Sequence, residues 1–240
     1  MGCVLQCGPR GIDRTVDYNS MNTGVRRHHH VVFDFDCTLT GQHWWKGIWQ
    51  GRFARDSRAG EVPLTEDEEL FLSEARTYEF VAHKSPYFPK LEGLLHHAWG
   101  GKERLQTTQN FLIALKSTDT LLSISTNGQV NEVMGVLGIS GIPLDTFAYI
   151  HGYDDKREKK IAYAVQEGEY SVFKSRSKEE FIHTVCDPED ASKCIYIDDD
   201  PCEYARVQSL CHTIPLDKEA AGMTTEHMDE ILRLVSVSDI

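Results

Sequence analysis

The stretch Val31-Val32-Phe33-Asp34-Phe35-Asp36-Cys37-Thr38-Leu39-Thr40 decides the fold of this chain. Its apolar start has the composition and length of a buried β-strand, and two carboxylates follow where such a strand would end. Because side chains alternate along a strand, Asp34 and Asp36 point to the same side if the extended pattern continues. Two neighbouring carboxylates repel each other unless a cation neutralises them or one of them holds a proton.

Asp34 and Asp36 allow two interpretations. In the first, they are solvated aspartates at the end of a strand, as short acidic patterns can be. In the second, they are a Mg²⁺-assisted nucleophile and its acid/base partner, because carboxylate oxygens suit Mg²⁺ and a positioned carboxylate can form a covalent intermediate. This stretch alone leaves both interpretations open.

Composition and charge exclude several classes of protein. The chain has 240 residues, enough to bury a full core, and a net charge of −12. This charge argues against a nucleic-acid partner, because phosphate backbones bind Lys and Arg, but one cation and a few local basic groups could still hold a phosphorylated substrate. The seven cysteines form no CxxC pair. They predict neither a disulfide framework nor a zinc site, and they favour a reducing, cytoplasmic compartment.

Residues 1–27 are predicted to be a disordered tail, because they are rich in small polar residues and show no sustained period. Gly2 after the initiator Met could be myristoylated, and Cys3 and Cys7 could then carry palmitate. Two acyl chains would anchor the protein at the cytoplasmic face of a membrane, where one chain holds only marginally. Gln6 stands where the acylation motif usually has a hydroxyl residue, so a plain tail is the alternative.

Further apolar runs alternate with helical patterns along the chain. Residues 121–126, 147–150 and 194–197 have the character of buried strands. Strands that alternate with helices predict an α/β fold, a three-layer Rossmann-like parallel sheet with helices on both faces. We assign 28–40 and 102–240 to this core, and 41–101 to a mostly helical cap insertion.

The insertion is rich in aromatic and basic residues. Trp44, Trp45 and Trp49 are interpreted as a small hydrophobic core of the cap, since large aromatic side chains tend to be buried. The alternative is a lid whose basic residues face a phosphate-bearing substrate.

Polar residues stand at the ends of three predicted strands. Asp34 and Asp36 follow the first, Thr126-Asn127-Gly128 ends the second, and Asp198-Asp199-Asp200 ends the strand at 194–197. Ligands of open parallel sheets bind at the carboxyl ends of the strands, where these groups would meet. Thr126 would also lie near a helix N-terminus, which favours phosphate oxygens.

In this arrangement the chain resembles the haloacid dehalogenase-like (HAD) superfamily. The first motif of that superfamily, DxDxT, reads Asp34 to Thr38 here, and the second ends in Thr126. The third is a lysine, for which Lys178 and Lys174 compete. The fourth is the acidic strand end at Asp198 and Asp199, with Glu203 shortly after. The resemblance covers residues 28–235 except for the insertion.

The resemblance implies a Mg²⁺-dependent phosphatase. Asp34 would be the nucleophile and Asp36 the general acid/base. Thr126, with Asn127 and Gly128, and the lysine would hold the phosphoryl group. The metal residues implied are Asp34, Asp36 through its backbone carbonyl, Asp199 and Asp198, with Glu203 as a possible support. The expected partner is a phosphorylated small molecule or a phosphoprotein. A phosphotransferase, a protein phosphatase and a catalytically silent, membrane-tethered binding module remain alternatives.

Overall fold

The computed structural model describes residues 29–49, 64–74, 84–154, 156, 158–165, 173–186, 193–217 and 222–236. The predicted tail at 1–27 and the predicted lipidation sites Gly2 and Cys3 lie outside the described residues. Within the described part of the chain, every helix is too short or too polar to cross a bilayer.

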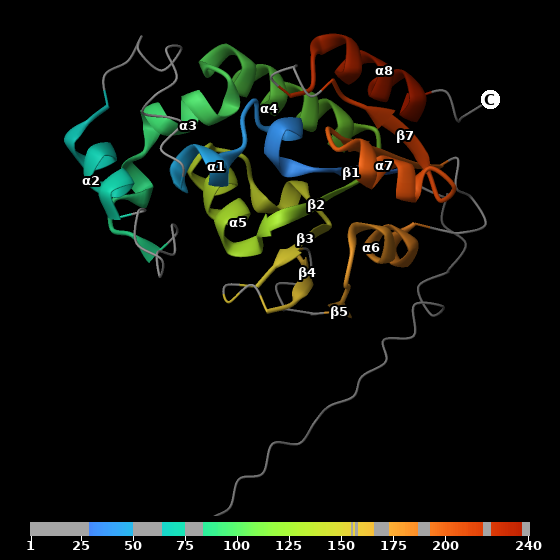
Figure 1. Ribbon diagram of the computed structural model, residues 1–240. Coiled ribbons are helices and arrows are strands. Elements are labelled where there is room, and N and C mark those ends of the chain that lie inside the picture. Colours follow the sequence, from blue (N-terminus) through green and yellow to red (C-terminus); the bar gives the residue numbers. More distant parts are fainter. Residues whose placement is uncertain are drawn as a thin grey trace, which may run out of the picture.

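One seven-stranded sheet forms the centre of the protein, in the order β5-β4-β3-β2-β1-β6-β7 (Figure 1). The strands are β1 (His30–Phe33), β2 (Leu121–Gln129), β3 (Tyr149–Tyr153), β4 (Lys160–Ala164), β5 (Phe173–Lys174), β6 (Cys194–Asp198) and β7 (His212–Pro215). Strands β3, β2, β1, β6 and β7 run parallel to one another, whereas β4 pairs antiparallel with β3, and β5 pairs antiparallel with β4. The prediction of a Rossmann-like sheet is confirmed. The sheet departs from the parallel arrangement at this edge, where the chain turns back after β3.

Helices cover both faces of the sheet. They are α1 (Trp44–Trp49), α2 (Glu66–Glu74), α3 (Glu92–Trp99), α4 (Lys102–Ser117), α5 (Val130–Ile139), α6 (Lys178–Val185), α7 (Pro201–Val207) and α8 (Thr225–Ser236), with short turns η2 (Phe35–Leu39), η5 (Phe88–Lys90) and η6 (Leu144–Thr146). Helices α4, α5 and α8 share one buried cluster with the sheet, and α6 and α7 share the other (Figure 1). The sheet and the helices on its two faces are the three predicted layers.

Alternation along β1 explains why both faces are covered. Val31 and Phe33 belong to the cluster under α4, α5 and α8, whereas Val32 belongs to the cluster under α6 and α7. All three side chains are fully buried. Each such burial contributes roughly 1.5–3 kcal/mol relative to exposure, so a central strand that is apolar on both sides requires a layer on each face.

The described residues between 41 and 101, where an insertion is predicted, include α1, α2, η5 and α3. Its buried side chains belong to the same apolar cluster as the core. Trp44 meets Phe88 edge to face at 6.3 Å, and Trp99 meets Phe35 of η2 at 6.3 Å. The side chains of Trp45 and Trp49 lie outside the described residues. Trp44 is therefore a core residue, and the limits of the insertion at 41 and 101 stay a prediction.

A buried carboxylate connects two helices of the insertion. Glu68 accepts the backbone N–H of Thr65 at 2.9 Å and that of Leu94 at 2.9 Å, so it caps the N-termini of both α2 and α3. Gly93 lies so close that a Cβ there would approach the Glu68 carboxylate to 2.9 Å. A capping box that the sequence contains at Thr65 to Glu68 thus also fixes how two helices pack.

A disulfide joins the end of α6 to the start of β6. Cys186 and Cys194 are bonded with their Cα atoms 5.9 Å apart, and both are buried. The expectation that the cysteines form no disulfide is wrong for this pair, because α6 runs back along the sheet and returns its end to the beginning of the next strand.

His30 is buried in β1. One ring nitrogen lies 2.8 Å from Ser123 Oγ, and the other lies 3.2 Å from the carbonyl oxygen of Val185. Burial lowers the pKa of His30 from its ordinary 6.5 to about 4, while the Val185 carbonyl opposes the shift. The folded protein therefore holds the neutral ring.

Acid should destabilise the protein through His30. Below about pH 6.5 the His30 ring of the unfolded chain is protonated, whereas the ring of the folded protein stays neutral down to about pH 4. The contribution of His30 to the free energy of unfolding is complete above pH 6.5 and falls by about 3 kcal/mol as the pH decreases toward 4. Urea unfolding of the wild type and of His30→Gln between pH 7 and 4.5 checks it. The wild type should lose stability more steeply than the variant, and parallel pH curves would contradict the assignment.

Candidate active site

Three strand ends form the site. In the sheet register Phe33 of β1 pairs with Ile124 of β2 on one side and with Ile197 of β6 on the other. The backbone N–H of Asp34 continues this ladder and donates to the carbonyl of Ile197 at 2.8 Å. Asp34, Asp198 and the end of β2 therefore lie level at the carboxyl edge of the sheet, where ligands of such folds bind.

Turn η2 places Asp36 beside Asp34. The chain turns sharply after β1, with Cys37 at φ 59°, and the turn closes when Thr40 N–H donates to Phe35 O at 3.0 Å. A left-handed residue other than glycine is uncommon and costs of order 1 kcal/mol, which the surrounding contacts must offset. The turn separates the surroundings of the two carboxylates, although they are two residues apart.

Asp36 faces the start of the insertion. Its Oδ1 accepts the backbone N–H of Trp44 at 2.7 Å, and its Oδ2 lies 3.2 Å from His43 Nδ1. Burial raises the pKa of Asp36 to about 6, while the Trp44 N–H and the charges of Lys178 and Lys46 oppose the rise. A carboxyl group with a pKa near neutrality can both give and take a proton, as a general acid/base must.

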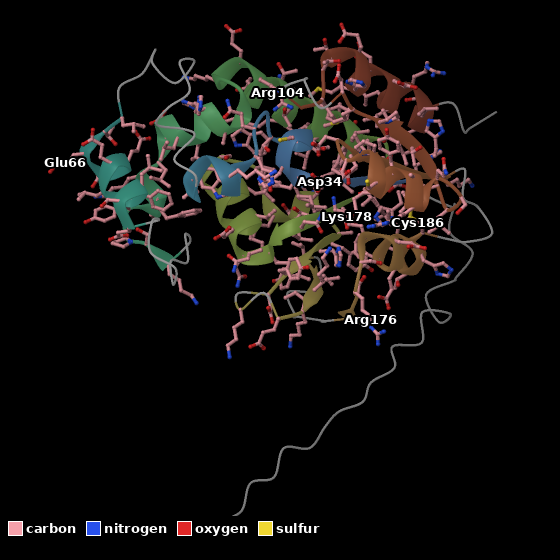
Figure 2. All side chains as sticks on the ribbon, viewed as in Figure 1. Asp34, Glu66, Arg104, Arg176, Lys178 and Cys186 are labelled. Atoms are coloured by element: carbon pink, nitrogen blue, oxygen red, sulfur yellow. A yellow bond between two sulfur atoms is a disulfide. The ribbon has the colours of Figure 1, made fainter. Side chains whose placement is uncertain are left out.

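Lys178 lies between two buried aspartates. Its Nζ is 2.6 Å from Asp34 Oδ1 and 2.7 Å from Asp198 Oδ2. Burial alone would lower the pKa of Lys178, but the two carboxylates outweigh it and raise the pKa. Burial also raises the pKa of Asp34, with Lys178 opposing and Asp198 adding to the rise. Figure 2 labels Asp34 and Lys178 at this position.

Helix α6 positions Lys178 in the site. Ser177 caps the helix by accepting the N–H of Glu180 at 3.1 Å, so Lys178 is the first helical residue. A cation is disfavoured at a helix N-terminus, and two carboxylates compensate for it here. Lys174, the competing candidate, lies in β5, the outermost strand of the sheet. Lys178 is the lysine that contacts the aspartates.

Asp198 is held on all sides. Besides Lys178, its Oδ2 accepts the hydroxyl of Tyr196, which is itself buried, and its Oδ1 accepts the backbone N–H of Asp200 at 2.7 Å. Burial raises the pKa of Tyr196, as does the charge of Asp198, so the hydroxyl keeps its proton to donate. The contact of Tyr196 with Asp198 is not evident from the sequence, because Tyr196 lies inside an apolar strand.

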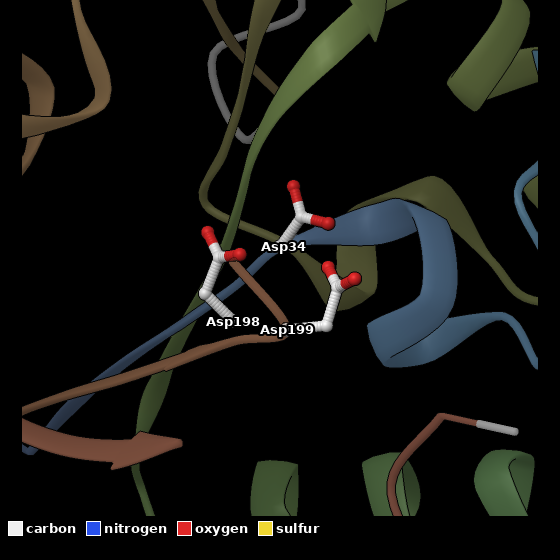
Figure 3. Close-up of side chains that lie close together, drawn as sticks. All are labelled: Asp34, Asp198 and Asp199. Atoms are coloured by element: carbon white, nitrogen blue, oxygen red, sulfur yellow. The ribbon is translucent and has the colours of Figure 1, made fainter. Parts of the chain in front are cut away.

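Three carboxylates could hold a metal ion. Asp34, Asp198 and Asp199 each offer an oxygen, and these atoms all lie within 4.8 Å of one another (Figure 3). An all-oxygen set of this charge fits Mg²⁺, which prefers carboxylates and water. The carboxylate of Asp36 is not part of this group, in keeping with a contribution through its backbone alone. Glu203, the expected support, has its Oε1 3.2 Å from Arg206.

Thr126, Asn127 and Gly128 line the end of β2. Thr126 is buried, and its Oγ1 accepts the N–H of Gly128 at 3.0 Å. A Cβ at Gly128 would lie 4.0 Å from Asp36 Oδ2, which places this turn against the acid/base candidate. The amide oxygen of Asn127 accepts Lys160 Nζ at 2.6 Å. Lys160 of β4 follows several charged residues in the sequence, and this local pattern gives no sign of its contact with Asn127.

Similar folds occur among solved structures. No protein-family model and no curated protein matches the chain. The HAD domain of the effector protein Lem4 from Legionella pneumophila is 14% identical, over 89% of this chain and 98% of that one, with a TM-score of 0.44. A predicted phosphatase from Clostridium acetobutylicum is 14% identical, over 85% and 91%, with a TM-score of 0.42.

A third similar structure is the HAD-hydrolase YfnB from Bacillus subtilis, bound to magnesium, 16% identical over 87% of this chain and 100% of that one, with a TM-score of 0.41. Similarity at this level says nothing about activity. The resemblance to the HAD-like superfamily rests instead on four sequence motifs, whose aspartates, threonine and lysine lie together at the carboxyl edge of the sheet.

Proposed function

We propose that this protein is a Mg²⁺-dependent phosphatase that hydrolyses a phosphomonoester through an aspartyl-phosphate on Asp34. The observation that carries the proposal is that the two neighbouring aspartates, Asp34 and Asp36, have different surroundings. Asp34 contacts a buried lysine and belongs to a group of three carboxylates, whereas Asp36 is held apart by a backbone N–H. A nucleophile and an acid/base partner need such unlike surroundings.

The reaction proceeds in two displacements. A carboxylate oxygen of Asp34 forms a bond to phosphorus as the bond to the leaving oxygen breaks, and Asp36 gives its proton to that oxygen. Asp36 then takes a proton from water, whose oxygen attacks phosphorus and releases inorganic phosphate and Asp34. Lys178 and Thr126 hold phosphoryl oxygens during both displacements, because the transferred group carries spread negative charge.

Mg²⁺ would be held by Asp34 and Asp199, with Asp198 beside them and the backbone carbonyl of Asp36 as a further ligand. Bound there, the ion supplies charge neutralisation for the approach of an anionic phosphoryl group to an aspartate. Asp198 serves mainly to position Lys178, because Lys178, Tyr196 and the Asp200 N–H already occupy its oxygens.

The substrate is a phosphorylated small molecule or a phosphoprotein, which keeps a protein phosphatase and a phosphotransferase as alternatives. The remaining alternative is a catalytically silent binding module. The raised pKa values of Asp34 and Asp36 disfavour it, because a binding module has no use for a buried pair of repelling acids.

Asp34→Asn should lower turnover of p-nitrophenyl phosphate at least roughly a hundredfold, the scale expected for removal of a nucleophile. Turnover by the wild type should require Mg²⁺ and disappear with a chelator. The matched control is Asp145→Asn, an exposed aspartate far along the chain, which should behave as the wild type. Equal activity of Asp34→Asn and wild type would reject the mechanism. A Mg²⁺-dependent rise in Tm without turnover on any phosphomonoester would favour the binding module.

A further inference from the structure

A second lysine lies at the rim of the site. Lys160 begins β4, and its Nζ donates to Asn127 Oδ1 at 2.6 Å, next to the phosphoryl-binding candidate Thr126. Its ammonium group also lies over the ring of Tyr153, 5.3 Å from the centroid. Burial and the charge of Lys178 lower the pKa of Lys160, whereas the charges of Glu203 and Asp34 oppose this shift.

The backbone around Gly152 places the contact between Lys160 and Asn127 beside the proposed catalytic residues. Strand β3 passes the end of β2 so tightly that a Cβ at Gly152 would come within 2.6 Å of the carbonyl of Gly128 and 3.0 Å of the Thr126 methyl. Tyr153 and Lys160 are register partners across the β3/β4 pair. Glycine at 152 thus lets the hairpin press against the turn of Thr126 to Gly128, and this brings Lys160 to Asn127.

The hydrogen bond orients the amide of Asn127. An ammonium group can only donate, so the atom it contacts must be the amide oxygen. The amide nitrogen then lies on the opposite side with two N–H groups to donate. Lys160 itself keeps N–H groups beyond the one that it gives to Asn127. The two side chains therefore present several donors and a positive charge together.

Lys160 differs from Lys178 in how its charge is balanced. Lys178 contacts two buried carboxylates. Within the described part of the chain, Lys160 forms no ion pair with a carboxylate, and its closest polar partner is a neutral amide. Lys160 is also partly exposed and the rim residue Asn127 is exposed, whereas Thr126 and Lys178 are buried. A partly desolvated cation without a carboxylate partner favours an anionic ligand.

We propose that Lys160 and the Asn127 amide form a specificity site for a second anionic group on the substrate, on the leaving-group side of the transferred phosphoryl. The buried donors Lys178 and Thr126 serve the phosphoryl group, so the rim pair is left for the remainder of the substrate. The substrate class is a phosphomonoester whose leaving group carries a carboxylate or a second phosphate close to the ester oxygen. This inference rests on the proposed phosphatase function and adds the substrate class to it.

Two substrates of nearly equal size test the proposal. 3-Phosphoglycerate and glycerol 3-phosphate differ in one group, a carboxylate against a hydroxymethyl. The wild type should favour 3-phosphoglycerate in kcat/KM. Lys160→Met should lower that preference roughly ten- to hundredfold, mainly through KM for 3-phosphoglycerate, since a charge-assisted hydrogen bond is lost. Lys159→Met removes the neighbouring exposed lysine and should leave the preference as in the wild type.

A binding experiment separates this inference from the phosphatase proposal. In an Asp34→Asn background without turnover, 3-phosphoglycerate should raise Tm more than glycerol 3-phosphate does, and adding Lys160→Met should abolish the difference. If the wild type hydrolyses no phosphomonoester but this difference is present, the catalytic proposal fails and the anion site stands. If Lys160→Met changes both substrates equally, or neither, the anion site is overturned whether or not the protein is a phosphatase.

Discussion

Replacing Lys178 with methionine is expected to abolish turnover and to weaken the fold. The substitution leaves Asp34 and Asp198 facing each other in a buried site with no cation between them. Breaking a buried charge network by removing one partner costs about 3–5 kcal/mol of unfolding free energy. Loss of a positive donor to the phosphoryl group should lower kcat about a hundred- to a thousandfold. Urea unfolding and p-nitrophenyl phosphate hydrolysis measure the two effects.

A double variant separates folding from chemistry. In Lys178→Met combined with Asp198→Asn, one of the two buried negative charges is gone, so much of the lost stability should return. Turnover should stay absent, because no cation is restored beside Asp34. If the double variant regained turnover, Lys178 would act only by holding the fold. If Lys178→Met alone were as stable and as active as the wild type, the contacts with Asp34 and Asp198 would not matter.

Lys178 also illustrates what the sequence could predict. The residues Ser177 to Glu180 form a capping box, which makes Lys178 the first residue of a helix, and a cation there requires a nearby anion. The acidic strand ends supply two. Asp34, Thr126 and Asp198 were predictable in the same way, because each stands where a long apolar run stops, and parallel strands bring their carboxyl ends to one edge. These arguments need only local patterns and one topological rule.

The residues that sequence reasoning missed depend on tertiary contacts. Lys160 ends a run of charged residues and begins β4 at the antiparallel edge of the sheet, so its contact with Asn127 depends on a strand pairing that no local pattern specifies. Tyr196 looks like an ordinary aromatic residue of a buried strand until the register puts its hydroxyl beside Asp198. Cys186 and Cys194 have no recognisable spacing, because their pairing depends on where α6 ends above the sheet.

Arg104 carries the second large effect that we expect, on stability rather than on chemistry. This side chain of α4 donates to four backbone carbonyls, those of Trp99 at 2.8 Å, Leu39 at 2.9 Å, Thr38 at 3.2 Å and Met223 at 3.4 Å. Burial lowers the pKa of Arg104 to about 10, which still leaves the guanidinium charged at neutral pH. One residue thus joins the turn after Asp36, the end of α3 and the segment before α8.

Arg104→Met should lower the free energy of unfolding by about 3 kcal/mol, because methionine partly fills the space but removes the Arg104 donor from four carbonyls, of which Thr38 O keeps the Met223 N–H. Arg104→Lys should fall between, since one ammonium cannot reach all four carbonyls as a planar guanidinium does. Arg233→Met, at an exposed position of α8, is the matched control and should change stability by less than about 0.5 kcal/mol. Urea unfolding of the four proteins ranks them.

The same variants should report on the site. Thr38 and Leu39 belong to η2, the turn that sets the distance between Asp34 and Asp36, so releasing their carbonyls should loosen Asp36. Misplacement of a catalytic group by about 1 Å can cost up to roughly a hundredfold in rate. We therefore expect kcat to fall about tenfold or more in folded Arg104→Met, with KM changed much less. A variant that lost stability but kept the wild-type kcat would show that η2 holds its shape without Arg104.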